Sequence, residues 1–136
     1  MYDMARVLLV DDEKSIRITL GRFLADDGHE VDVAGTAQDA LAMLDEKSFD
    51  VVVTDIVLPR MTGVALLEQI RERDAFVQVI LMTGEPTVET ASHAVRGGAA
   101  DYLLKPITKP AILRAVEACA RLKQVEDERR RLEEDQ

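Results

Sequence analysis

The sequence predicts an α/β fold in which a doubly wound, five-stranded parallel sheet has helices on both faces. Short runs rich in valine, leucine and isoleucine alternate along the chain with segments whose apolar residues recur at helical spacing. Four of these runs are almost entirely apolar, as strands are when helices cover both faces of a parallel sheet. The 136 residues, 47% of them hydrophobic, are enough for one domain with a core of its own.

The N-terminal half is predicted to contain three strands and the two helices between them. The first helix spans residues 14–27, and Gly28 is suited to the position just past its end. Its apolar face is formed by Ile16, Leu20, Phe23 and Leu24. The second helix begins after Thr36, which forms the pattern of a capping box with Asp39, and its apolar stripe follows. The strands of this half are expected at residues 6–10, 31–34 and 51–54.

The C-terminal half is predicted to contain two strands and three helices. A helix at residues 62–72 has an apolar stripe formed by Val64, Leu67 and Ile70. Pro86 suits the first turn of a short helix that ends before Gly97 and Gly98. The last helix begins near residues 108–110. The strands of this half are expected at residues 77–82 and 100–104.

The expected strand order determines which strand ends lie together. Five strand-then-helix units with right-handed connections favour the flavodoxin-like order 2-1-3-4-5, which places the first and third strands at the switch point. Ligands of such sheets bind beside the carboxyl ends of the strands. Polar residues follow four of the predicted strands at this edge, namely Asp11 and Asp12, Asp55, Thr83 and Lys105. We therefore expect three carboxylates, a hydroxyl and an ammonium group to form one site.

These groups suit a divalent cation and a phosphoryl group. Mg²⁺ prefers oxygen ligands, and we expect Asp12 and Asp55 to bind it directly and Asp11 to bind it through water. A carboxylate can accept a phosphoryl group, so Asp55 is also the candidate nucleophile. Lys105 would offset charge on the phosphoryl oxygens, and Thr83 could donate its hydroxyl proton to one of them.

Each of these residues alone has an ordinary structural explanation. Asp11 or Asp12 could cap a helix. Asp55 and Thr83 could each belong to a turn, and Lys105 could be an exposed lysine before a proline. Their coincidence at the same end of four strands favours a site. A small hydrolase with an aspartyl-phosphate intermediate is the alternative function, although the chain has no insertion long enough to form a cap over a substrate.

Four motifs resemble those of the receiver domain of two-component response regulators, and the resemblance covers about residues 5–122. The motifs are LLVDDE at 8–13, TDIVLPRMTG at 54–63, MTG at 82–84 and DYLLKP at 101–106. Each motif alone is weakly specific, and together they are highly specific for this family.

The resemblance implies a role for each site residue. Asp55 would be the phosphoacceptor, with Asp11 and Asp12 as its acidic pocket. The backbone carbonyl of Val57 would be a further metal ligand. Thr83 and Tyr102 would form a switch pair. Lys105 would contact the phosphate with its side chain. The Lys105–Pro106 peptide bond that follows is usually cis in this family.

A domain of this kind would receive its phosphoryl group from a sensor histidine kinase or a phosphotransfer protein, with Mg²⁺ required. It would be a module of phosphorelay signal transduction rather than a metabolic enzyme, although it would assist its own phosphorylation and dephosphorylation. Val57 is apolar where many receivers have a polar residue, and Glu85 lies two residues after Thr83. Because Val57 cannot orient an attacking water, we expect a long-lived aspartyl phosphate.

Composition excludes several classes of function. Seventeen basic residues against 26 acidic ones give a net charge of -9, which disfavours direct binding of nucleic acid. No transmembrane stretch or signal-peptide pattern is present, so we expect a cytoplasmic protein without a membrane partner.

Cys119 is the only cysteine, which excludes an intramolecular disulfide and a cysteine-based zinc site, and we expect it to pack as a small apolar residue on a helix. His29 and His93 are both expected at the surface.

The C-terminal residues 111–136 lack glycine and proline and predict one helix of roughly 40 Å. We expect a receiver domain at residues 1–122 and a helical extension at residues 123–136 that links to an output domain. Leu122, Val125 and Leu132 form a weak coiled-coil seam, which could support a phosphorylation-dependent homodimer. A solvated helix end that frays is the alternative. The predicted i,i+4 ion pairs are Glu126–Arg130, Asp127–Arg131, Arg129–Glu133 and Arg130–Glu134.

Overall fold

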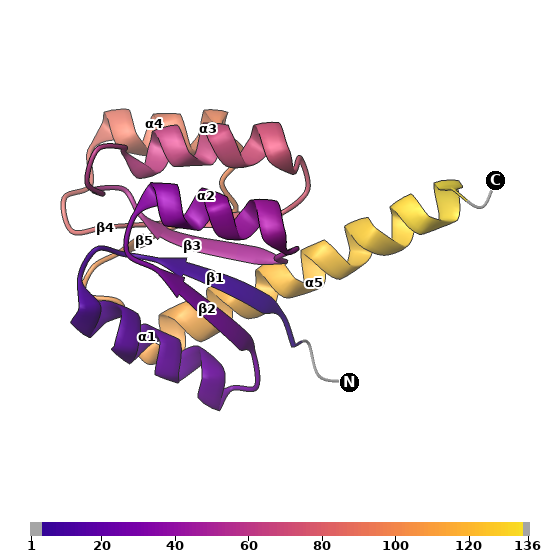
Figure 1. The fold of residues 1–136 in the computed structure, drawn as a ribbon, viewed down its shortest axis with the longest axis horizontal. Coiled ribbons are helices and arrows are strands. Elements are labelled where there is room, and N and C mark those ends of the chain that lie inside the picture. Colours follow the sequence, from indigo (N-terminus) through magenta and orange to yellow (C-terminus); the bar gives the residue numbers. More distant parts are fainter. Residues whose placement is uncertain (1–3, 135–136) are drawn as a thin grey trace.

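The computed structural model describes residues 4–134 and has one five-stranded sheet between two layers of helices (Figure 1). The elements in chain order are β1 (Arg6–Val10), α1 (Lys14–Asp26), β2 (Glu30–Ala34), α2 (Ala37–Glu46), β3 (Val51–Asp55), α3 (Gly63–Arg73), β4 (Gln78–Thr83), α4 (Val88–Arg96), β5 (Asp101–Leu104) and α5 (Lys109–Glu134). Helices α1 and α5 cover one face of the sheet, and α2, α3 and α4 cover the other. The predicted α/β class and the extended C-terminal helix are confirmed.

The strand order is β2-β1-β3-β4-β5, as predicted, and every strand pair is parallel. In the register of the three central strands, Val10 of β1 lies beside Thr54 of β3, and Asp55 lies beside Met82 of β4. The residues that follow these strands therefore emerge at one edge of the sheet, which is where the candidate site was expected.

Two apolar layers explain why the central strands read as continuous hydrophobic runs. In β1, Val7 and Leu9 pack in the layer beneath α1 and α5, whereas Leu8 and Val10 pack in the layer beneath α2 and α3. All four side chains are fully buried, because successive residues of a strand point to opposite faces and both faces are covered. Alternation between apolar and polar residues is therefore absent from this strand.

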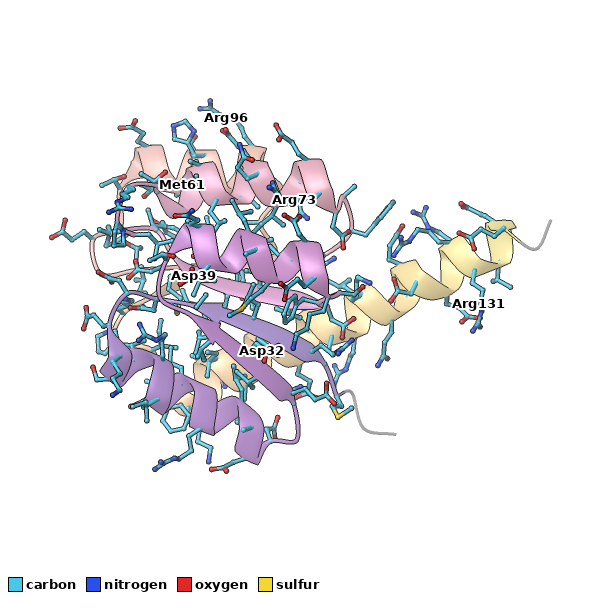
Figure 2. All side chains as sticks on the ribbon, viewed as in Figure 1. Asp32, Asp39, Met61, Arg73, Arg96 and Arg131 are labelled. Atoms are coloured by element: carbon cyan, nitrogen blue, oxygen red, sulfur yellow. The ribbon has the colours of Figure 1, made fainter. Side chains whose placement is uncertain are left out.

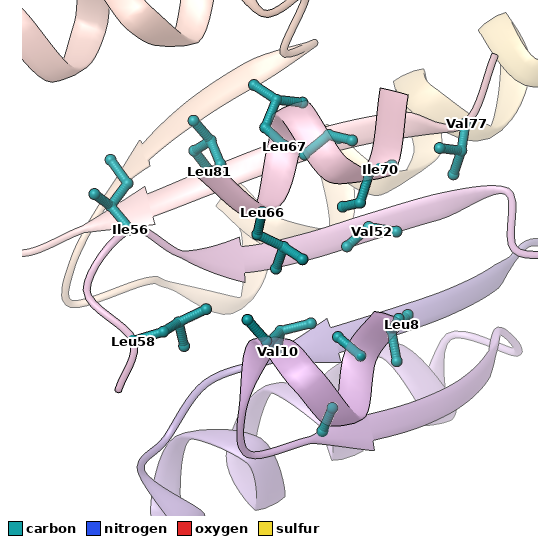
Figure 3. Packing of buried hydrophobic residues seen from close by; sticks show 14 of the residues in the cluster. Leu8, Val10, Val52, Ile56, Leu58, Leu66, Leu67, Ile70, Val77 and Leu81 are labelled. Atoms are coloured by element: carbon teal, nitrogen blue, oxygen red, sulfur yellow. The ribbon is translucent and has the colours of Figure 1, made fainter. Parts of the chain in front are cut away.

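The layer on the α3 side is shown in Figure 3. Leu66, Leu67 and Ile70 of α3 are fully buried there, together with Val52 of β3 and Leu81 of β4. Leu67 and Ile70 were predicted to be on the apolar face of α3, and both are buried. Val64 was also predicted there but is only half-buried, and the buried Leu66 was not predicted. The helix lies over the middle of the sheet, so its buried face is wider than a stripe with one residue per turn.

Two local predictions are wrong. Pro86 is not in the first turn of α4, because Thr87 is the N-cap and forms a reciprocal capping box with Thr90, so that the helix begins at Val88. His29 is not at the surface: it is 5% exposed, and its Nδ1 atom accepts a hydrogen bond from the backbone N–H of Ala5 at 2.9 Å. The turn from α1 to β2 carries His29 next to the residue that precedes β1, a neighbour that local sequence does not reveal.

Helix α5 continues well past the sheet as one uninterrupted helix (Figure 1). Lys123 Nζ lies 4.0 Å from Asp50 Oδ1, and the Arg130 guanidinium stacks over the Phe76 ring at 4.0 Å from its centroid. Asp50 and Phe76 lie in the loops that precede β3 and β4. The first part of the extension is therefore attached to the amino-end edge of the sheet, opposite the candidate site.

The outer part of α5 has charged side chains on its surface, including Arg131 (Figure 2). Its ion pairs are Glu126–Arg129, Asp127–Arg130, Glu128–Arg131 and Lys123–Asp127. Three of these four pairs have i,i+3 spacing. Of the predicted i,i+4 partners, Glu133 acts on Arg129 through its charge, while the hydrogen bond of Arg129 goes to Glu126. The seam residues Leu122, Val125 and Leu132 are more than half exposed.

Within residues 4–134, no helix combines the length and apolarity needed to cross a bilayer.

Cys119 lies on the buried face of α5, as predicted. Burial raises the pKa of its thiol to about 12, and the charge of Asp101 contributes in the same direction. The thiolate is the reactive form, so we expect the native protein to react very slowly with Ellman's reagent at pH 8 and the urea-unfolded protein to react at once. Fast reaction of the native protein would show that α5 opens readily from the sheet.

Candidate functional site

The three predicted carboxylates meet at the carboxyl ends of β1 and β3. Asp11 and Asp12 begin the loop between β1 and α1, and Asp55 is the last residue of β3. Each residue offers a carboxylate oxygen, and these oxygens lie within 4.8 Å of one another. Asp11 and Asp55 are buried, whereas Asp12 is exposed. A cluster of oxygen ligands with one open side fits Mg²⁺, which retains water molecules among its ligands.

Lys105 joins the two buried carboxylates. Its Nζ atom donates to Asp11 Oδ2 at 2.8 Å and to Asp55 Oδ2 at 2.5 Å. Burial alone would lower the pKa of this ammonium group, but hydrogen bonds and charge from Asp11 and Asp55 outweigh that effect and raise the pKa above its ordinary value. Three carboxylates with one ammonium leave two negative charges at the site, which is the charge that one divalent cation would neutralise.

The approach of Lys105 depends on the chain direction after β5. The Lys105–Pro106 bond is cis, as the resemblance implied. The backbone N–H of Lys105 donates to the carbonyl of Thr83 at 2.7 Å, which continues the pairing of β5 with β4 beyond the end of the strand. These two features fix the backbone from which the lysine side chain reaches Asp11 and Asp55.

The backbone around Asp55 is held by a close contact with the start of α3. The N–H of Gly63 donates to the carbonyl of Ile56 at 2.6 Å. A Cβ atom at residue 63 would lie only 2.4 Å from the carbonyl oxygen of Asp55 and 2.7 Å from the Cα atom of Ile56. Only glycine fits there. Gly63 was part of a quoted motif, but its role depends on this three-dimensional approach and could not be inferred from spacing alone.

Val57 has its backbone at the site and its side chain in solvent. Its N–H donates to Asp55 Oδ1 at 2.9 Å, so the loop after β3 turns back on the acidic residue. The residue is 68% exposed. The sharp turn continues at Arg60, which adopts a left-handed backbone with φ of 68°. Such a conformation is unusual for arginine, and nothing in its sequence neighbourhood predicted it.

Thr83 and Tyr102 are on neighbouring strands but have different partners. Thr83 is buried at the end of β4, and its Oγ1 atom accepts a hydrogen bond from the N–H of Glu85 at 3.0 Å. The Tyr102 hydroxyl lies 2.7 Å from Thr90 Oγ1, in the first turn of α4. The side chains of the predicted switch pair are thus not hydrogen-bonded to each other. Thr90, the hydrogen-bond partner of Tyr102, is a further residue that the sequence did not indicate.

Comparison with known proteins assigns the family. The family described as the response regulator receiver domain matches residues 7–117. The response regulator protein FleR of Pseudomonas aeruginosa is 41% identical over 109 residues, which cover 80% of this chain and 23% of FleR. A receiver domain protein from Methanospirillum hungatei has a similar structure, with a TM-score of 0.87, 29% identity and coverage of 90% of this chain and 98% of its own. NtrX from Brucella abortus aligns with a TM-score of 0.88 and 33% identity over 95% of this chain and 30% of NtrX.

This chain belongs to the response regulator receiver domain family of two-component systems. It is a signalling domain of the phosphoacceptor type, and the hydrolase alternative is not favoured. The chain spans between 21% and 30% of the length of the curated relatives it matches.

Proposed function

We propose that this receiver domain accepts a phosphoryl group on Asp55 in a Mg²⁺-dependent reaction and that its donor is a sensor histidine kinase or a phosphotransfer protein. The observation that carries this proposal is the meeting of Asp11, Asp12 and Asp55 within 4.8 Å, with Lys105 hydrogen-bonded to two of them. Membership of the receiver family supports the same chemistry.

Each group has a distinct part in the transfer. A carboxylate oxygen of Asp55 attacks phosphorus, and the bond between phosphorus and the donor nitrogen breaks as the imidazole leaves. Lys105 exchanges its contact with Asp55 for one with the incoming phosphoryl oxygens and offsets their charge. Asp12, Asp55 and the Val57 carbonyl would bind Mg²⁺ directly, with Asp11 acting through water. When bound, the ion would supply positive charge to the same phosphoryl oxygens.

An apolar groove beside Lys105 supports a protein donor. The groove has a volume of about 410 Å³, and its lining comes from α1 and from the segment between β5 and α5. Its lining residues are Ser15, Ile16, Thr19, Leu20, Lys105, Pro106 and Ile107. A partner that packed its own apolar side chains here would present its phosphohistidine next to the acidic cluster.

The test of this function is phosphorylation by acetyl phosphate, followed by intact mass spectrometry. We expect one phosphoryl group per chain in the presence of Mg²⁺ and none in the presence of excess EDTA. Metal-independent modification would contradict the proposal. Sustained release of p-nitrophenol from p-nitrophenyl phosphate would instead favour the hydrolase alternative.

We further propose that Thr83 and Tyr102 transmit the phosphorylated state to α4. Thr83 uses its oxygen to accept from Glu85, so its hydroxyl proton can still be donated to a phosphoryl oxygen. Movement of Thr83 would change the space beside Tyr102 and the contact between Tyr102 and Thr90. Thr90 belongs to the capping box of α4, so this contact links the site to the helix start. The face formed by α4, β5 and α5 would change in consequence.

Thr83→Ala should separate phosphorylation from transmission. We expect this variant to be phosphorylated by acetyl phosphate to the same extent as the wild type, because Thr83 neither accepts the phosphoryl group nor binds the metal. The amide shift changes that beryllofluoride and Mg²⁺ induce around Tyr102 and Thr90 should be clearly smaller. Ser48→Ala, which changes an exposed hydroxyl in the loop between α2 and β3, is the control and should respond normally. An unchanged response in Thr83→Ala would remove Thr83 from the switch.

We also propose that residues 123–134 form a helical extension of the receiver at residues 1–122, that the extension leads to an output domain, and that phosphorylation promotes a homodimer through the seam. The last two residues of the predicted extension, 135 and 136, lie outside the described residues. A stable coiled coil needs apolar seam positions sustained over roughly three to four heptads. The seam of Leu122, Val125 and Leu132 is shorter than about two heptads and is interrupted at Arg129, so it is too short to hold a tight dimer alone. The remodelled face near α4 has exposed Val88 and Val95 that could add to the contact.

Sedimentation velocity on the full chain tests the dimer. We expect a monomer or a weak dimer at micromolar concentration and a shift towards the dimer with beryllofluoride and Mg²⁺. Replacement of the three seam residues by serine should abolish this shift. This variant keeps the contact between Arg130 and Phe76, which a protein that ended at Leu122 would lack. An identical response of both proteins would exclude the seam from assembly.

A further inference from the structure

Arg17, on the second turn of α1, reaches back to the acidic loop. Its Nη1 atom donates a hydrogen bond to the carbonyl oxygen of Asp11 at 2.8 Å. The guanidinium group also lies against Gly35, in the turn between β2 and α2, where an added Cβ atom would be 3.2 Å from Nη1 and 3.6 Å from Cζ. Arg17 is half-buried between these two loops. This side chain has no part in the transfer described above.

The contact with Asp11 holds one specific peptide group. The carbonyl of Asp11 belongs to the peptide bond that joins it to Asp12, so the arginine sets the orientation of that plane. The other groups of Asp11 are also bonded. Its N–H donates to Ala34, its Oδ1 atom accepts from the N–H of Glu13 at 2.9 Å, and its Oδ2 atom accepts from Lys105. If Arg17 were removed, the Asp11 carbonyl would have no hydrogen-bond partner in the described chain, whereas the other polar groups of Asp11 would keep theirs.

Asp12 depends on this backbone arrangement. Its carboxylate is exposed, and within residues 4–134 it has no hydrogen bond to orient it. The start of α1 gives little additional support, since its N-cap residue Glu13 makes no side-chain capping bond. The backbone from which Asp12 projects its carboxylate is therefore held at the peptide group whose carbonyl Arg17 bonds.

We propose that Arg17 is a positioning residue of the cation site: it fixes the Asp11–Asp12 peptide so that the Asp12 carboxylate faces Asp11 and Asp55. Gly35 leaves the space that the guanidinium occupies. The guanidinium is needed because it can fill the space beside Gly35 and donate to the Asp11 carbonyl at the same time, which a compact ammonium group does less well. This inference rests on the proposed Mg²⁺ binding and adds a residue on which its affinity depends.

The sign of the effect separates positioning from electrostatics. A positive side chain near a carboxylate cluster repels a cation, so removal of its charge alone should tighten Mg²⁺ binding. Loss of positioning should weaken binding, since the Asp12 carboxylate would be spread over more orientations. The two explanations therefore predict opposite changes for the same substitution.

The experiment is a Mg²⁺ titration of the unphosphorylated protein, followed by amide shifts of the residues around the site. We expect Arg17→Gln to raise the dissociation constant about 3- to 10-fold, which corresponds to one hydrogen bond of ordinary strength. Lys14→Gln removes one charge from the exposed first turn of the same helix and should leave binding unchanged or slightly tighter. Arg17→Lys keeps the charge and should bind less tightly than the wild type.

Three outcomes would overturn the inference. They are wild-type affinity in Arg17→Gln, full wild-type affinity in Arg17→Lys, and tighter binding in Arg17→Gln. Urea unfolding without Mg²⁺ monitors the fold of each variant, and a variant that loses stability but binds Mg²⁺ normally would assign Arg17 a structural role only. If the wild type shows no saturable response to Mg²⁺, the proposed function fails instead, and the two failures are thereby distinguished.

Discussion

Asp55→Asn should abolish phosphorylation by acetyl phosphate in the presence of Mg²⁺. The carboxamide keeps the size of the side chain but has no anionic oxygen with which to attack phosphorus. It also removes one of the three carboxylates that would hold the cation, and it leaves Lys105 a neutral amide oxygen in place of one of its two anionic acceptors. Intact mass spectrometry should therefore show no added phosphoryl group at a donor concentration that modifies the wild type fully.

Asp32→Asn is the matched control for this substitution. Asp32 is also a strand aspartate, but it lies on β2, pairs with Lys47 and is outside the acidic cluster. We expect it to be phosphorylated as the wild type is. Modification of Asp55→Asn to the wild-type level would show that another residue is the acceptor, and peptide mapping would then locate it.

Gly63→Ala should have the largest effect on stability. The added methyl group would be placed 2.4 Å from the carbonyl oxygen of Asp55, well inside van der Waals contact, and the neighbours are backbone atoms that cannot rotate away. We expect the free energy of unfolding to fall by about 2–4 kcal/mol, measured by urea denaturation. Any relief of the clash moves the backbone of Asp55, so Mg²⁺ binding should weaken as well.

Gly84→Ala provides a control of the same kind at the same edge of the sheet. Gly84 follows β4, and a Cβ atom there would have Lys105 Cβ at 3.9 Å as its nearest neighbour, which is an ordinary contact. We expect its stability to remain close to that of the wild type. Equal stability of the two variants would mean that the loop after β3 relaxes freely and that Gly63 does not constrain Asp55.

The fold could be predicted from sequence because both of its signals are local. Runs such as residues 51–54 and helical stripes such as that of α1 are each read within one element, and the strand order then follows from chain connectivity. The burial of His29 was missed because its hydrogen-bond partner Ala5 is distant in the sequence. The start of α4 was misplaced for a local reason, because Pro86 and the capping box of Thr87 with Thr90 are both helix-start signals and the capping box sets the start.

The site was predictable in composition but not in detail. Strand ends are identifiable in sequence, so the grouping of Asp11, Asp55 and Lys105 could be inferred. The partners of each atom could not be inferred, because they depend on loop conformation. The bond between Tyr102 and Thr90 and the close approach of Gly63 to Asp55 are both of this kind. They arise from backbone geometry that no spacing encodes.

Helix α5 begins at the edge of the sheet where the acidic cluster lies and ends beyond the opposite edge. Residues 124–134 add roughly 16 Å of helix past Lys123, at the standard rise per residue. The helix therefore has a longer part, residues 109–123, that packs on the receiver and a shorter part, residues 124–134, that projects beyond the sheet and contacts the receiver through Arg130 and Phe76. A tilt of about 10° in the packed part would move the tip by roughly 3 Å on simple helix geometry. A side-chain rearrangement too small to alter the fold would thus become a displacement large enough for another protein surface to detect.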